Sequence, residues 1–66
     1  MTVEQMIKRL EEDGCAVQRM EGDDRMIHVD GYFPPDAKGL PPWIWDEQGW
    51  SISTCGIARV FMTRVG

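Results

Sequence analysis

The chain has 66 residues, of which 42% are hydrophobic and 27% charged, and 11 acidic residues against 7 Lys and Arg give it a net charge of -4. A chain this short buries only about 60% of its unfolded surface, which excludes a two-lobed enzyme with a cleft between domains. We therefore expect one small domain spanning residues 1–66. The excess of carboxylates argues against direct binding to nucleic acid, which depends on neutralising phosphates.

The composition also bears on localisation and on bound groups. No apolar segment approaches the roughly 18 residues that a membrane span needs, and the first residues lack a basic stretch followed by an apolar one. These features predict a soluble, cytoplasmic protein with no membrane partner. Cys15 and Cys55 lie far apart and His28 is the single histidine, a pattern that does not fit a structural zinc site. No glycine-rich phosphate loop is present, so we expect neither a metal nor a cofactor.

Residues 2–13 predict an amphipathic helix. Thr2 and Gln5 have the spacing of a capping box, and Gly14 suits the left-handed position that ends a helix. The apolar side chains that recur with helical spacing are Val3, Met6, Ile7 and Leu10. We expect this stripe to pack against the rest of the domain.

The next segment, residues 15–30, predicts a β-hairpin with its turn at 21–24. Closing this turn pairs Met20 with Arg25 and fixes which side chains share a face. The face expected to cover the helix holds Ala16, Met20, Ile27 and Val29. The opposite face is expected to hold Cys15, Val17, Arg19, Met26, His28 and Asp30.

Four prolines exclude a helix or a central strand from residues 31–42, which we therefore expect to form a long loop. Beyond the loop, residues 43–53 predict a second hairpin, with its turn at 46–49 and all three tryptophans on one face. Residues 57–65 favour a final strand, although a helix also fits their apolar spacing. The predicted fold is α+β, one N-terminal helix packed on an antiparallel sheet of about four to five strands.

Aromatic residues and prolines are concentrated between Tyr32 and Trp50. Tryptophan and tyrosine are enriched among the residues that dominate protein interfaces, and long loops in small domains are often functional. The alternative is that the three indoles form the core of a domain with little Leu and Phe. The candidate partner-binding residues are Tyr32, Phe33, Leu40, Trp43, Trp45 and Trp50.

Acidic residues form a second candidate surface. They are Glu11, Glu12, Asp13, Glu21, Asp23 and Asp24. The first three stand in the last turn of the predicted helix, where the helix dipole disfavours carboxylates, so we infer a reason other than helix stability. All six form one acidic patch if the helix end and the first turn lie at the same end of the domain. Such a patch could enter a cationic groove, or it could simply keep a small protein soluble.

These observations predict a small, non-enzymatic acidic protein that binds another protein, one with a basic surface, through its aromatic and proline-rich segment. We expect a regulator or inhibitor of the kind found among bacterial and phage accessory proteins. One alternative is an acidic mimic of nucleic acid that occupies a cationic groove of a nucleic-acid-binding protein. Another is a thiol enzyme, with Cys15 as nucleophile, His28 as base and Asp30 orienting the ring. A homodimer that covers a sheet edge or the indole face is also compatible with so small a domain.

Overall fold

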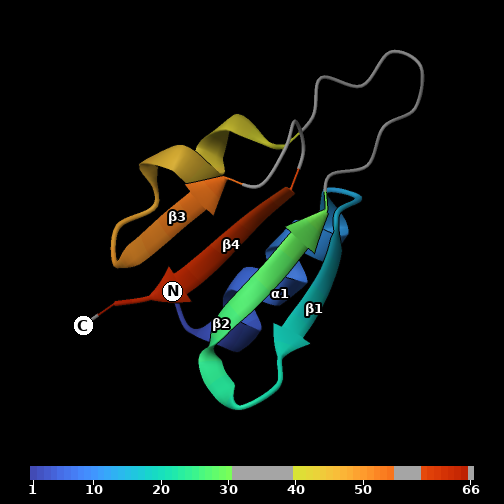
Figure 1. Ribbon diagram of the computed structural model, residues 1–66. Coiled ribbons are helices and arrows are strands. Elements are labelled where there is room, and N and C mark those ends of the chain that lie inside the picture. Colours follow the sequence, from blue (N-terminus) through green and yellow to red (C-terminus); the bar gives the residue numbers. More distant parts are fainter. Residues whose placement is uncertain (31–39, 55–58, 66) are drawn as a thin grey trace.

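The computed structural model describes residues 1–30, 40–54 and 59–65. One helix, α1 (Val3–Glu12), packs on a four-stranded antiparallel sheet with strand order β1-β2-β4-β3 (Figure 1). The other elements are β1 (Ala16–Met20), β2 (Asp23–Asp30), the 3-10 helix η1 (Pro42–Asp46), β3 (Trp50–Thr54) and β4 (Arg59–Arg64). This architecture confirms the α+β prediction and the final strand. No helix in the described ranges is long and apolar enough to cross a membrane.

Helix α1 begins at the predicted capping box. The backbone N–H of Thr2 donates to Gln5 Oε1 at 2.8 Å, and the backbone N–H of Gln5 donates to Thr2 Oγ1 at 3.1 Å. Gly14 follows the helix with φ 88°, the left-handed conformation expected there. Met6 and Leu10 are fully buried, so the predicted apolar stripe faces the sheet.

The register of the first hairpin differs by one residue from the prediction. Val17 pairs with Val29 and Arg19 with Ile27, and a bulge follows Arg19. The turn closes more tightly than expected, at residues 21–22, because Gly22 adopts φ 83° there and the bulge takes up the extra residues of β2.

This shift changes which side chains of β1 face the helix. Ile27 and Val29 are buried, as predicted, but Ala16 is exposed on the other face. Cys15 is buried in the core and Val17 packs against it, so their predicted placement beside His28 is wrong.

The predicted second hairpin is wrong. Residues 43–45 belong to η1, and β3 pairs with β4 instead. Proline suits the start of a helical turn because its φ is fixed and its missing N–H is not needed there, whereas a strand ladder needs that donor. Pro41 and Pro42 therefore begin a 3-10 helix, which separates the three tryptophans instead of aligning them.

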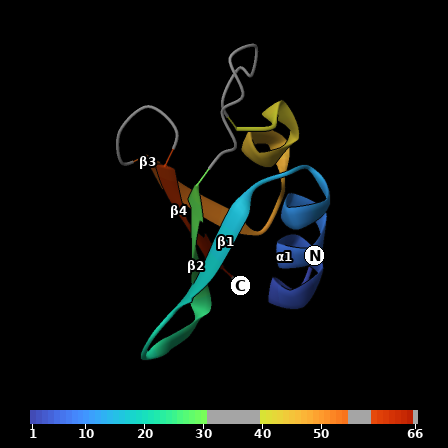
Figure 2. The same cartoon turned by 90° about the vertical axis from the view of Figure 1, so that its right-hand side faces the viewer.

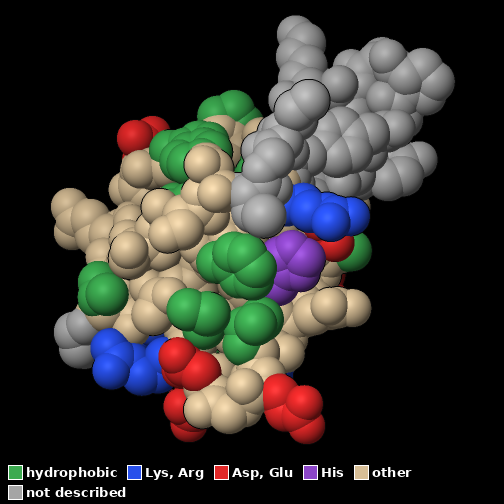
Figure 3. All heavy atoms as spheres, in the orientation of Figure 1, with side chains coloured by type: hydrophobic (Ala, Val, Ile, Leu, Met, Phe, Trp, Pro, Cys, Tyr) green, Lys and Arg blue, Asp and Glu red, His purple; other side chains and the backbone are tan. Residues whose placement is uncertain are grey.

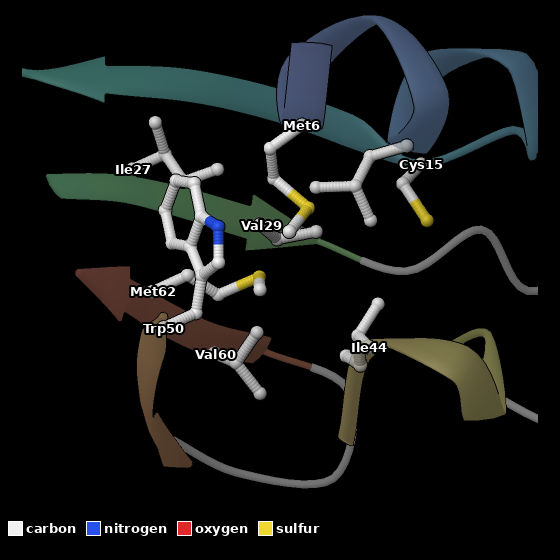
Figure 4. Close-up of a cluster of buried hydrophobic side chains, with 9 residues drawn as sticks. Met6, Cys15, Ile27, Val29, Ile44, Trp50, Val60 and Met62 are labelled. Atoms are coloured by element: carbon white, nitrogen blue, oxygen red, sulfur yellow. The ribbon is translucent and has the colours of Figure 1, made fainter. Parts of the chain in front are cut away.

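The core lies between the sheet on one side and α1 with η1 on the other (Figures 2 and 4). Its buried members are Met6, Leu10, Cys15, Ile27, Val29, Ile44, Trp50, Val60 and Met62. α1, β2, η1, β3 and β4 each contribute at least one of these side chains, and Val17 of β1 packs against them partly buried. The predicted loop, apart from residues 40–42, lies outside the described residues, as does Cys55.

Two glycines with nearly the same backbone conformation provide a matched test of the turns. Gly22 has φ 83° and Gly49 has φ 84°, but an added Cβ meets nothing within 4 Å at Gly22 and lies 2.7 Å from Arg64 Nη1 at Gly49. That guanidinium also donates to the backbone oxygens of Gly49, at 3.1 Å, and Val65, at 2.7 Å.

We expect Gly22→Ala to lower the free energy of unfolding by about 1 kcal/mol, because the left-handed conformation is strained for alanine. Gly49→Ala should lower it further, because the arginine must also move. Chemical denaturation measures both variants. Equal losses would show that Arg64 makes room for the added methyl group at no cost in stability.

Candidate functional site

Trp45 is the most exposed large hydrophobic side chain in the described part of the protein, at 51%. Its exposure follows from the geometry of η1, in which successive side chains point about 120° apart. Ile44 is fully buried and Trp43 packs against the core, which leaves Trp45 directed outward. The structure thus exposes one indole on a short element in which the two preceding side chains pack in or against the core.

Trp43 ties η1 to the last turn of α1. Its indole Nε1 donates to Asp13 Oδ2 at 2.6 Å, and the guanidinium carbon of Arg9 lies 4.1 Å from the centre of its ring. A hydrogen bond to a carboxylate is stronger than one between neutral groups. The guanidinium is in addition attracted to the face of the indole ring. These contacts explain why a carboxylate stands at position 13, against the preference of the helix dipole.

The other predicted partner-binding residues have different environments. Trp50 is 8% exposed and belongs to the core, and its indole Nε1 has no hydrogen-bond partner among the described residues. Leu40 is half-buried and packs against the core. Tyr32 and Phe33 lie outside the described residues. Of the three indoles, one is therefore buried, one is half-buried and one is exposed.

The six acidic residues do not form one patch. Because α1 and β1 run in opposite directions, Glu11, Glu12 and Asp13 lie near the start of β1, whereas Glu21, Asp23 and Asp24 lie at its far end (Figure 1). A five-residue strand separates the two groups by about 17 Å. The condition for a single patch, that the helix end and the first turn lie at the same end of the domain, is therefore not met, because the chain reverses at Gly14 between helix and strand. The first turn of α1 is next to the hairpin end instead, where Glu4 Oε1 accepts from Arg19 Nη2 at 2.8 Å.

The face of the sheet that points away from α1 is here called the open face. Side chains alternate along each strand, so the residues between the buried ones belong to it. They are Ala16, Gln18, Met26, His28, Asp30, Ser51, Ser53, Arg59, Phe61 and Thr63. Figure 3 looks onto this face and shows the histidine among hydrophobic side chains, with a basic and an acidic side chain beside it.

Two contacts cross from β2 to β4 on the open face. His28 stacks on Phe61 with ring centres 4.8 Å apart, and Asp30 Oδ1 lies 2.9 Å from Arg59 Nε. The sequence did not single out Phe61 or Arg59, because their neighbours come from a strand far away in the chain. Asp30 Oδ1 also lies 3.7 Å from His28 Nε2, but Cys15 is on the other face of the sheet, so the three residues of the thiol-enzyme alternative do not meet.

Within the described ranges, no group of three or more His, Cys, Asp or Glu residues is placed to hold a metal ion. Comparison with protein-family models, with curated proteins and with solved structures finds no match for this chain.

The contact between Trp43 and Asp13 can be tested with neighbouring carboxylates. Asp13→Ala should lower the free energy of unfolding by about 1 kcal/mol relative to Glu12→Ala, because only the first removes the acceptor of the indole N–H. Both variants remove one carboxylate from the end of α1, so any gain from the helix dipole cancels in the comparison. Chemical denaturation measures the difference, and indistinguishable variants would contradict the role given to Asp13.

The ion pair between Glu4 and Arg19 should be visible in a pH titration. The hydrogen bond from Arg19, and then the backbone N–H of Glu4, lower the pKa of this exposed carboxyl from its ordinary value of 4.5. A lowered pKa means that the pair stabilises the fold above the ordinary value and that this contribution is lost as the pH falls through the lowered one.

Carbon-detected NMR should show the pKa of Glu4 returning toward 4.5 in Arg19→Gln. Arg9→Gln removes the same charge elsewhere on the protein and should leave the pKa of Glu4 nearly unchanged. The same pKa in all three proteins would mean that the pair does not form in solution.

Proposed function

We propose that this protein acts by binding another protein, with the exposed indole of Trp45 as the central contact. In this proposal it is a non-enzymatic, cytoplasmic regulator or inhibitor, and its partner presents a basic surface. One observation carries the proposal. Trp45 is 51% exposed, whereas the two residues before it in η1, Trp43 and Ile44, pack in or against the core. A tryptophan gains much from burial and is the residue type most enriched among interface hot spots.

The packing of η1 supports this role. Association costs free energy when flexible side chains and loops become ordered at an interface, so a contact residue that is already held in place binds at lower cost. Buried Ile44 and the hydrogen bond from Trp43 to Asp13 hold η1 before any partner arrives. Leu40 and Trp43 in this view position Trp45, although the sequence placed them in the contact itself.

Charge around Trp45 favours a basic partner. Asp46 follows it directly and is exposed, and Asp13 lies at the end of α1 to which η1 is attached. With a net charge of -4 on the chain, a basic surface is attracted over the distance of a Debye length. The nucleic-acid mimic relies on one continuous acidic surface, and the separation of the six carboxylates gives it less support than the aromatic contact.

The test compares two exposed hydrophobic residues. Trp45 and Val65, which is 43% exposed, are truncated separately to alanine. Tagged wild-type protein first captures its partner from host lysate at rising salt, and dissociation constants are then measured with the purified partner.

Trp45→Ala should weaken binding at least 10-fold, and Val65→Ala should leave it within about twofold, because hot spots are few within an interface. Binding to the wild type should survive high salt, whereas binding by an acidic mimic would collapse. Chemical denaturation checks that both variants are folded. A folded Trp45→Ala variant that binds as tightly as the wild type would refute the proposal.

A further inference from the structure

The open face is the other large surface that the described elements leave uncovered, because α1 and η1 both lie on the opposite side of the sheet (Figure 2). We propose that a second copy of this chain covers it, in a two-fold symmetric dimer in which the two sheets pack face to face around β2 and β4. This inference goes beyond the proposed function and does not depend on Trp45, which belongs to η1.

The register of β2 against β4 carries the inference. On the open face Met26 pairs with Thr63, His28 with Phe61, and Asp30 with Arg59. In two of these rows the side chains are complementary in kind, an acid beside a base and an imidazole beside a phenyl ring. Arg59 Nε lies 2.9 Å from Asp30 Oδ1, and the ring centres of His28 and Phe61 lie 4.8 Å apart.

A two-fold axis can place residues that pair side by side in one sheet opposite each other's copies in two facing sheets. The axis runs parallel to the strands, above the boundary between β2 and β4. It places β2 of one copy over β4 of the other and keeps each residue at the same height along the strand. Asp30 then faces Arg59 of the second copy, and His28 faces its Phe61. By symmetry both contacts occur twice, as in any isologous interface.

The rest of the open face fits such packing. Sheets that pack face to face lie about 10 Å apart, so large or charged side chains on the flanking strands would keep them separated. The flanks carry only Ala16 and Gln18 on β1 and Ser51 and Ser53 on β3. A partner of uniform charge would match either Asp30 or Arg59 but not both, whereas a second copy matches both. The surface therefore favours the chain itself as occupant.

Charge-reversal variants test the arrangement by sedimentation over a range of concentrations. Asp30→Arg alone brings the introduced arginine against Arg59 of the second copy, and Arg59→Asp alone brings the introduced aspartate against Asp30. Like charges facing each other across an interface cost several kcal/mol, so each variant alone should dimerise at least 10-fold more weakly than the wild type.

An equal mixture of the two variants should dimerise again. The introduced arginine then meets the introduced aspartate, and native Arg59 of one chain meets native Asp30 of the other. Within each variant chain the ion pair between positions 30 and 59 is still missing. If this pair acted only within one chain, mixing the two variants would not restore dimerisation. Chemical denaturation confirms that the variants are folded, and Trp45→Ala should dimerise like the wild type.

Three results would overturn the inference. The first is a wild-type protein that stays monomeric up to millimolar concentration. The second is a mixture that forms no more dimer than its components. The third is a dimer that persists in both single variants, which would place the contact elsewhere, such as at the edge of β1 or β3. Loss of partner binding in Trp45→Ala with dimerisation intact would separate this inference from the proposed function.

Discussion

The pairing of β4 with both of its neighbours is the constraint on which the rest of the structure depends. β4 lies in the interior of the sheet, between β2 and β3, although it comes last among the strands in the chain. Its buried side chains, Val60 and Met62, oppose Val29 and Ile27 and belong to the same core cluster as Met6 and Leu10 of α1. Without this strand the first hairpin and the tryptophan-containing segment would share no backbone hydrogen bonds in the sheet. The fold therefore depends on contacts between residues far apart in sequence, and forming them requires the closure of long loops.

Local signals in the sequence predicted local structure well. The capping box at Thr2 and Gln5, the glycine at position 14 and the apolar stripe of α1 each depend on residues within a few positions of one another, and all are confirmed. The choice of partner for β3 depends instead on a distant strand. The register of the first hairpin depends on a bulge after Arg19 that no short sequence motif predicts. Such features depend on the packing of the whole core, and patterns among neighbouring residues do not predict that packing.

The tryptophans show the same contrast between what local sequence predicts and what distant contacts decide. Their number and spacing predicted a shared surface, but Pro41 and Pro42 turn the chain into η1 and send each indole to a different environment. Which of them stays exposed was decided by the burial of Ile44, a residue that the sequence analysis did not single out. Asp13 is the converse case, because its unfavourable place at the end of a helix correctly indicated another role. Its acceptor contact with Trp43 supplies that role.

The two proposed surfaces are compatible because they lie on opposite sides of one sheet. η1, the element that carries Trp45, packs on the core side of the sheet, and the open face carries Asp30, Arg59 and the ring pair on the other side. A dimer formed through the open face would therefore leave both copies of Trp45 accessible. Two linked contacts bind a partner with repeated sites more tightly than either contact alone, without any new interaction. In such a dimer the open face would supply the stability of the assembly, and the two Trp45 contacts would supply its avidity.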